Sequence, residues 1–513
     1  MRLKNVAKNS FFNIISQVIL IVVGFFSQRV MNLRIGEELV GMNSVISNIL
    51  ALLSVSELGI ASAVIYHLYR ALAEQNEEQI AGLMKLYRKA YGFFAAFISV
   101  IGLCILPFVH LFLNENSFSL RYVRVVYLLW LIRTVLSYLL SYKRSLLIAD
   151  QKEYVVSILV LLANVMNYSM IIVLLQFTKN YPLVLLLNIL VEVAINLWIS
   201  GYVDRKYPYL KQMAKRPLET SMIHKVMGDI KNIFVTRLST KLLVSTDSLI
   251  ISSFVNVAMV GLYSNYCMIT QSIVNIMQAL TSALKPSVGN MFMEEDQKKN
   301  YEVLRQITFV FFVIVSVCSV CLFTLMTPFV TDFWLNEAYG LSMPVVVLSV
   351  VIFALTAMGF PLELVMSATG LFQKERNLSV IIAVANLGLS LLFVKPLGII
   401  GVQVGTIAAY LIQMVYRTRV FFKEYLNQNA VQYSKELIQY GCLIILETVA
   451  GYGLVRLFYK ERDPLLFIAA GVICVVVPCL INLLLYFRSW RLKSVFNMGM
   501  ELIGGKEAWT KHS

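Results

Sequence analysis

The apolar segment from residue 230 to residue 255 carries polar side chains on one face. Arg237 and Lys241 lie about one helical turn apart, and Ser245 and Ser248 continue the stripe within about 80° of one line at 3.6 residues per turn. A guanidinium, an ammonium and two hydroxyls supply positive charge and hydrogen-bond donors, which suit an anionic group. Because this face cannot point toward lipid, we expect it to line water, another polar surface or ion-pairing acids.

Several acids also lie inside apolar segments, where an ionisable group is costly and is usually kept for a partner or a function. They are Glu57, Glu192, Asp247, Glu363 and Glu447. Asp247, at the edge of the basic stripe, Glu57 and Glu363 are candidates for binding a coupling proton or cation. Each acid has a second interpretation, in which it pairs with an arginine such as Arg133.

The first apolar segment, residues 10–33, has its own polar stripe. Its members are Asn13, Ser16, Gln17, Gly24, Ser27 and Gln28. Arg29 falls about 160° away from that line on a straight helix, although a bend at Gly24 would redirect it toward the same cavity. The alternative is that Arg29 and Arg34 reach the outer lipid headgroups.

These residues belong to a chain that is far too apolar to be a soluble enzyme. Of its 513 residues, 58% are hydrophobic and 14% are charged, against about 45–50% and about 25% in soluble domains. The mean hydropathy of +0.74 also excludes a disordered chain. The composition predicts a polytopic membrane protein.

About fourteen apolar runs are long enough, at about 20 residues each, to cross a bilayer as helices, so the predicted fold class is an all-α polytopic membrane protein. The spans are 10–33, 43–69, 89–113, 121–147, 154–176, 181–203, 230–255, 262–290, 303–327, 343–369, 377–394, 399–420, 436–459 and 464–487. Lys and Arg are concentrated on the tails and alternate loops, which predicts cytoplasmic N- and C-termini. Topology and anionic headgroups explain the net charge of +15 without nucleic acid as a partner.

A short repeat indicates how these helices are organised. LVGMNSV at 39–45 matches MVGLYSN at 259–265, each following the first helix of a six-helix block. This predicts two bundles related as a parallel repeat, followed by two extra helices. The predicted parts are an N-terminal six-helix bundle (1–204), a cytoplasmic basic linker (205–229), a C-terminal six-helix bundle (230–422), an extra helix pair (436–487) and a cytoplasmic tail (488–513).

Enzymatic and cofactor-binding motifs are not found in the sequence. It contains no phosphate-binding glycine loop, no nucleophile elbow and no HExxH pattern. All seven cysteines lie in apolar spans, and the spacing of Cys318 and Cys321 has no second pair with which to form a metal site. The sequence therefore predicts no enzyme, no cofactor and no metal.

Three stretches resemble a known family. They are GEELVGMNSVISNILALLSVSELGIASAVIYHLYRALAEQNEEQIAGLMKLYRKAY from Gly36, YKRSLLIADQKEY at 142–154, and ATGLFQKERN with ANLGLSLLFVKPLGIIGVQVGT within 368–406. They are similar to the bacterial flippases of O-antigen, capsule or exopolysaccharide repeat units, in the multidrug/oligosaccharidyl-lipid/polysaccharide exporter superfamily. The resemblance covers nearly the whole chain.

The resemblance implies two six-helix bundles around a cavity that opens alternately to each side of the bacterial cytoplasmic membrane, with the last two helices packed outside as a lipid groove. The implied cargo is an undecaprenyl-pyrophosphate-linked oligosaccharide, moved to the outer leaflet by membrane potential or ion exchange. The resemblance does not identify the residues that bind its pyrophosphate. From the helix-face argument above, we expect them to be Arg237, Lys241, Arg29, Ser245 and Ser248. The implied partners are the lipid bilayer, a polysaccharide polymerase and glycosyltransferases.

Two other functions are compatible with such a chain. A cation-coupled multidrug exporter shares the architecture, but its cavity is expected to favour acids and aromatic residues over a basic stripe. A membrane polysaccharide polymerase acts on the same lipid-linked substrate, but such an enzyme usually presents a large outer loop, and the outer loops here are short.

Overall fold

The computed structural model describes residues 2–54, 64–65, 67–114, 117–210, 238–239, 241–242, 245–292, 296–460, 462–487 and 489. Across these ranges the regular secondary structure is entirely helical. Twelve helices of the described part are long and apolar enough to cross a membrane, which confirms the all-α polytopic fold class. The predicted spans 43–69 and 230–255 include residues outside the described ranges.

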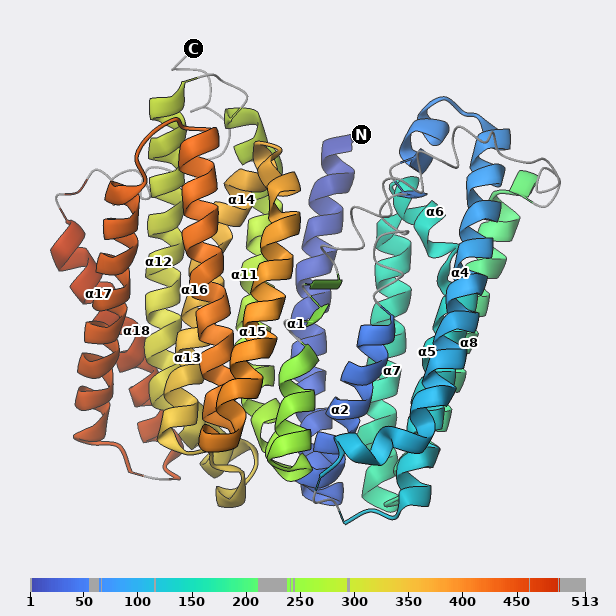
Figure 1. The fold of residues 1–513 in the computed structure, drawn as a ribbon, viewed down its shortest axis with the longest axis horizontal. Helices are drawn as coiled ribbons and strands as arrows, with labels where there is room; N and C mark the ends of the chain where they lie inside the picture. Colours follow the sequence, from blue (N-terminus) through green and yellow to red (C-terminus); the bar gives the residue numbers. More distant parts are fainter. Residues whose placement is uncertain are drawn as a thin grey trace. The chain divides into compact units, whose positions relative to one another are not determined.

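The long helices are labelled in Figure 1. They are α1 (Arg2–Ile35), α2 (Glu37–Leu53), α4 (Glu77–Ile105), α5 (Leu120–Ser141), α7 (Glu153–Phe177), α8 (Tyr181–Lys206), α11 (Val257–Met291), α12 (Gln297–Pro328), α13 (Met343–Met358), α15 (Glu375–Leu397), α16 (Ile399–Glu424), α17 (Val431–Arg456) and α18 (Pro464–Tyr486). The short ones are α6 (Arg144–Ala149), α14 (Phe360–Ala368), the 3₁₀ helices η1 (Leu106–Phe112), η3 (Glu337–Tyr339) and η4 (Leu371–Lys374), and the π-helix η2 (Phe329–Trp334).

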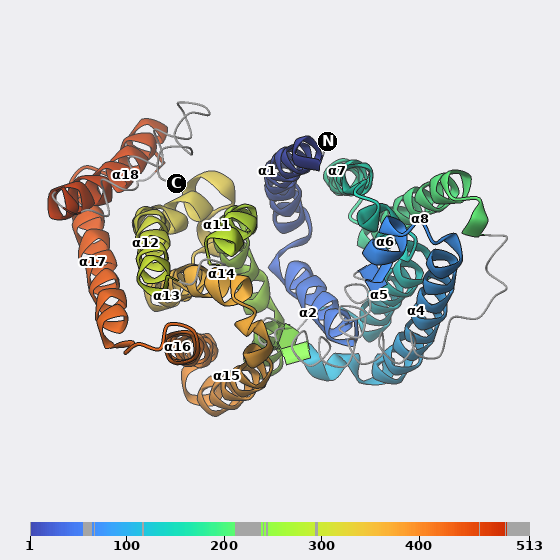
Figure 2. The ribbon, with the colours of Figure 1, turned by 90° about the horizontal axis from the view of Figure 1, so that it is seen from above.

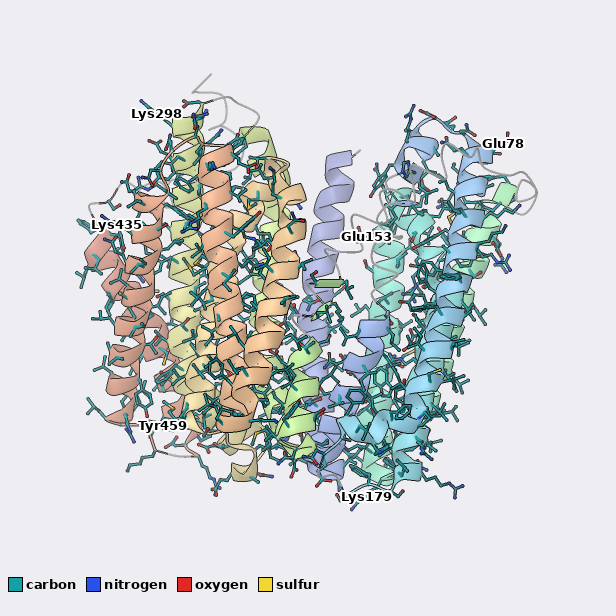
Figure 3. All side chains as sticks on the ribbon, viewed as in Figure 1. Glu78, Glu153, Lys179, Lys298, Lys435 and Tyr459 are labelled. Carbon is teal, nitrogen blue, oxygen red and sulfur yellow. The ribbon has the colours of Figure 1, made fainter. Side chains whose placement is uncertain are left out.

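Polar side chains mark where several of these apolar helices begin. Asn76 accepts a hydrogen bond from the Gln79 amide at 3.0 Å at the start of α4, and Asn180 accepts one from the Leu183 amide at 3.2 Å at the start of α8. Such caps satisfy backbone donors that the helix itself leaves unpaired and contribute about 1 kcal/mol each. Charged side chains also lie at the ends of helices, as Lys298 at the start of α12 illustrates (Figure 3).

By its internal contacts the chain divides into two compact units. Unit 1 comprises Met1–Asn265 and Ser379–Gly405, and unit 2 comprises Tyr266–Leu378 and Thr406–Ser513. The domain boundaries expected from the sequence stay a prediction, because residues 211–229 of the expected linker and the first residues of the expected C-terminal bundle, 230–237, lie outside the described residues.

In unit 1, α1 packs along α7, and α8 contacts both α5 and α7. The repeated motif forms a close helix crossing here. A Cβ atom at Gly41 would lie 2.0 Å from the carbonyl oxygen of Val257, and one at Gly261 would lie 2.0 Å from the carbonyl oxygen of Glu37. The two glycines therefore allow α2 and the start of α11 to touch backbone to backbone.

In unit 2, α12 is the central helix. It contacts α13, α14, α17 and α18, and seen from above, α17 and α18 lie on one side of it and α14 on the other (Figure 2). The buried core beside α14 is built from aliphatic and aromatic side chains of α11, α12, α14, α16 and α17, including Leu304, Leu364 and Phe421. This packing holds α16 and α17, two of the helices that line the groove described below.

Candidate functional site

The described part of the predicted basic stripe is a helical stretch that includes residues 241–242 and 245–254. Lys241 and Ser248 are half-buried, whereas Ser245 is fully buried and its hydroxyl has no hydrogen-bond partner among the described residues. Arg237, with which the stripe begins, lies outside the described residues. A lysine and a buried hydroxyl thus stand where the sequence predicts an anion-binding face.

Beside this stretch, unit 1 contains a cluster of buried oxygen-bearing side chains. Thr246 donates from Oγ1 to Oδ1 of Asn386 at 3.4 Å, and Ser390 donates to the carbonyl oxygen of Val402 at 3.3 Å. Asn386 and Ser390 are both completely buried on α15, and the neighbouring Asp247 is half-buried. Carboxylate, amide and hydroxyl oxygens are the groups that hold protons or hard cations in membranes.

Sequence reasoning found Asp247 but missed Asn386 and Ser390. Both occur in the predicted span 377–394, four residues apart, so they share one face of the helix. That spacing is the signal that would have identified them. It was weak because single polar residues in apolar spans commonly serve only to join helices.

The polar stripe of the first helix is partly used in helix packing. Gln28 donates from Nε2 to Oδ1 of Asn265 at 3.1 Å, and Asn32 donates to the same oxygen at 2.8 Å. Arg29 is half-buried and Arg34 is exposed. The exposure of Arg34 fits the headgroup interpretation, and the role of Arg29 stays a prediction.

Two of the intramembrane acids pair with arginines. Glu192 accepts from Nε of Arg133 at 2.8 Å, and Glu363 lies 3.5 Å from Nη1 of the buried Arg417. Both contacts correspond to the ion-pair interpretation of these acids. Glu57 lies outside the described residues.

An apolar groove of about 420 Å³ lies in unit 2 between α12, α13, α16 and α17. It is lined mainly by aliphatic side chains. Representative lining residues are Phe323, Val347, Ala354, Met414, Gly441 and Val449. No atom lies within 4 Å of a Cβ placed at Gly441, so this glycine keeps the groove open along α17. A groove of this size and lining suits a hydrocarbon chain.

Two polar clusters lie beyond the spans. In unit 1, Tyr207 donates its hydroxyl to Asp150 at 2.5 Å, and Lys152 contacts the same carboxylate. Burial, reinforced by the hydrogen bond to Asp150, raises the pKa of the Tyr207 phenol. This cluster therefore keeps a neutral phenol against the Asp150 side chain at the end of α8.

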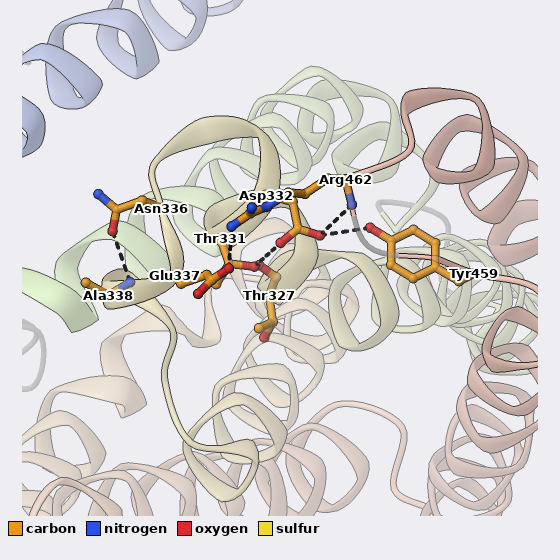
Figure 4. A network of polar contacts seen from close by, with 8 residues as sticks. All are labelled: Thr327, Thr331, Asp332, Asn336, Glu337, Ala338, Tyr459 and Arg462. Carbon is orange, nitrogen blue, oxygen red and sulfur yellow. Dashed lines mark hydrogen bonds and ion pairs between the residues drawn. The ribbon is translucent and has the colours of Figure 1, made fainter.

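In unit 2, the connection between α17 and α18 is held by the π-helix η2 (Figure 4). Asp332 accepts hydrogen bonds from the Tyr459 hydroxyl at 3.2 Å and from the Arg462 amide at 3.4 Å. The guanidinium of Arg462 also pairs with Glu337. The loop of the C-terminal helix pair is thus fixed to the end of α12.

The fold is similar to that of several solved membrane transporters. The chain superposes on the lipid II flippase MurJ in its inward closed conformation with a TM-score of 0.69, 14% identity, and coverage of 93% of this chain and 99% of the other. An inward-facing multidrug resistance MATE family transporter gives a TM-score of 0.66 at 12% identity, covering 79% and 97%. A MOP superfamily transporter from Pyrococcus furiosus gives 0.50 at 13% identity, covering 81% and 96%. No protein-family model and no curated protein matches the sequence.

Proposed function

We propose that the protein is a flippase that moves polyprenyl-pyrophosphate-linked oligosaccharides from the cytoplasmic to the outer leaflet of a bacterial cytoplasmic membrane, for cell-surface polysaccharide synthesis. The observation that carries the proposal is the apolar groove of unit 2, in a chain with the fold of a lipid flippase. An amphipathic cargo of this kind needs two different environments, one for its tail and one for its headgroup.

The groove suits the tail. Its lining side chains are almost all aliphatic or aromatic, and no charged residue is among them. A polyprenyl tail gains about 25 cal/mol per Å² only on leaving water, so between lipid and groove its affinity comes from packing and not from the hydrophobic effect. Shape, including the open position at Gly441, is therefore what would select a tail.

The stripe around Lys241 suits the headgroup. A pyrophosphate that leaves water needs positive charge and hydrogen-bond donors, which Lys241, Ser245 and Ser248 supply together with Arg237. Outward transfer of negative charge is favoured by an inside-negative membrane potential, by about 2.3 kcal/mol per charge per 100 mV. Asp247, beside the oxygen cluster of Thr246 and Asn386, is the candidate for ion coupling.

The test is transbilayer movement of an undecaprenyl-pyrophosphate oligosaccharide in proteoliposomes under an imposed potential. We expect Gly441→Leu to slow movement at least tenfold by filling the groove, and Lys241→Ala to slow it by weakening headgroup binding. Gly453→Leu is the matched control for the groove, because Gly453 is also on α17 with no atom near its Cβ position but is outside the groove. Lys435→Ala, at an exposed lysine of α17, controls for loss of charge.

If the native protein moves the lipid and Gly441→Leu and Gly453→Leu reduce this movement equally, the groove has no role in the proposal. Failure of the native, folded protein to move any of several glycan-bearing lipids would contradict the flippase function itself. The second candidate function is drug export, which the fold shared with the MATE transporter favours. Efflux of ethidium by the native protein in the same vesicles, without lipid movement, would select it.

A further inference from the structure

Glu447 lies where three helices of unit 2 meet. Helices α12 and α17 run side by side in a constant register, shown by the pairs Arg305 with Glu436 and Ser316 with Glu447. Each member of the second pair follows the first by eleven residues, which is about 16 Å along a helix. The third helix, α18, reaches the same level through Asn482.

The three side chains at this level are removed from both lipid and water. Glu447 and Ser316 are completely buried, and Asn482 is 3% exposed. The Ser316 hydroxyl donates to Oε2 of Glu447, and Nδ2 of Asn482 donates to Oγ of Ser316 at 3.3 Å. Oε1 of Glu447 and Oδ1 of Asn482 remain buried without a hydrogen-bond partner among the described residues.

No basic side chain of the described chain pairs with Glu447. Along its own helix the nearest charges are Glu436, which pairs with Arg305, and Arg456, nine residues away and stacked on Tyr452. Helix α18 carries no charged residue at all. Lys298, Lys299, Glu302 and Lys435 lie near the starts of α12 and α17, at least twelve residues from Ser316 or Glu447 along the same helix. The other titratable groups on these three helices are phenols and thiols, which are neutral near pH 7. They are Tyr301, Tyr433, Tyr440, Tyr452, Tyr486, Cys318, Cys321, Cys442, Cys474 and Cys479.

The hydrogen bonds around Ser316 leave two buried oxygen atoms without a donor among the described residues. Ser316 donates its one hydroxyl hydrogen, and Asn482 donates one of its two Nδ2 hydrogens to Ser316. Oε1 and Oδ1, which have no partner among the described residues, can only accept while Glu447 is ionised. An ionised Glu447 would leave both acceptors unsatisfied and a full charge unpaired in a dry site, which is the most expensive arrangement available. One proton on Oε1 removes the charge and converts an unused acceptor into a donor.

A metal ion fits this site poorly. Glu447, Ser316 and Asn482 together offer four side-chain oxygen atoms, whereas a hard cation such as Ca²⁺ gathers about six to eight oxygen ligands. The described residues also contain no group of three or more His, Cys, Asp or Glu side chains placed to hold a metal ion. A proton needs only one donor atom and one acceptor.

We propose that Glu447 is a proton-binding site, and that its protonated carboxyl, with Ser316 and Asn482, joins the C-terminal helix pair to α12. The proton bridges α17 to the other two helices as a structural ligand. Removal of the proton places a negative charge between three helices and weakens their contact. Glu447, Ser316 and Asn482 are not among the residues that line the groove, so the proposal is independent of the cargo.

Infrared difference spectroscopy of the full-length protein in lipid vesicles at pH 7 tests this directly. We expect the native protein to show the C=O stretching band of a protonated carboxyl, and Glu447→Gln to lose it. Glu436→Gln is the matched control on the same helix, because Glu436 is paired with the guanidinium of Arg305 and should not contribute to this band. Ser316→Ala should shift the frequency of the band, whereas Ser319→Ala should not, because the buried Ser319 hydroxyl has no partner in the described structure.

Thermal unfolding provides a second readout. A carboxyl that is protonated only in the folded state makes the native protein lose stability as the pH rises from 5 to 8, and Glu447→Gln should abolish that loss. The same carboxyl band in native protein and Glu447→Gln would overturn the proposal. So would a band that disappears when Na⁺ replaces a large organic cation in the buffer, because that result would make the ligand an alkali ion. If Glu447→Gln fails to fold, the frequency shift in Ser316→Ala decides the same question.

Discussion

Gly41 and Gly261 occupy equivalent positions in one reciprocal contact: each lies against the carbonyl oxygen of the residue four places before the other, Val257 and Glu37. The two glycines also occupy equivalent positions in the repeated Val-Gly motif of the sequence. A reciprocal contact, in which each segment uses the same position to touch the other, is what a two-fold rotation between repeated segments produces. The two copies of the Val-Gly motif are therefore similar in sequence and also contact each other in the structure.

Alanine at either glycine is expected to disrupt this crossing. Its Cβ would overlap a backbone carbonyl that cannot rotate away, so Gly41→Ala and Gly261→Ala should each lower the free energy of unfolding by about 1–3 kcal/mol. Gly92→Ala on α4 is the control, because no atom lies within 4 Å of its Cβ position, and alanine is the better helix former by up to about 1 kcal/mol. Thermal unfolding in detergent measures both. Equal stability of the three variants would contradict the close crossing.

The ion pair between Arg305 and Glu436 is expected to matter more than the pair between Arg462 and Glu337. The first is largely buried, with side chains 17% and 10% exposed, and the second is 65% and 73% exposed. Glu436→Gln should cost about 3 kcal/mol or more, because it removes the negative charge that balances a largely buried guanidinium. Glu337→Gln should cost less than about 1 kcal/mol. Unfolding in increasing denaturing detergent compares the two, and a larger loss in Glu337→Gln would refute this ranking.

Gly451 tests the register of α12 and α17. Its Cβ position lies 2.6 Å from Cγ1 of Val320, so Gly451→Ala should destabilise the protein by about 1–3 kcal/mol. Because the obstruction is a single methyl group, adding Val320→Ala should restore much of the loss. A double variant that is no better than the sum of its parts would place the two residues out of contact.

The cluster at Tyr207 predicts an alkaline dependence. Burial and Asp150 raise the pKa of Tyr207 above its ordinary value of about 10. Above pH 10 the unfolded chain releases this proton and the folded chain retains it, so stability falls as the pH rises further, and Tyr207→Phe should flatten that slope. In ultraviolet titration near pH 11, Tyr207→Phe should remove little tyrosinate signal, because the phenol of Tyr207 still holds its proton at that pH.

Hydropathy was enough to predict the helices, because each span must satisfy its backbone internally and bury or expose a continuous apolar surface. Hydropathy was not enough to predict the partners of the buried polar side chains. Whether Glu192 pairs with Arg133, or Glu447 with a serine and an asparagine, depends on helices distant in sequence that meet in one plane of the bundle. No local pattern encodes such a meeting, so the sequence left each acid with two interpretations. The partners of Asn386 were missed for the same reason.

The anchoring of α17 has a thermodynamic consequence. Contacts near Glu436, at Glu447 and through Asp332 fix the helix pair to α12 at three heights, and α13, which forms another wall of the groove, packs on α12 as well. A groove whose walls are tied to one helix keeps its shape while other parts of a transporter move. It would bind a lipid tail equally strongly at every stage of a transport cycle. Uniform affinity of this kind retains the cargo without giving the cycle a direction, so direction would have to come from the headgroup and the ions that accompany it.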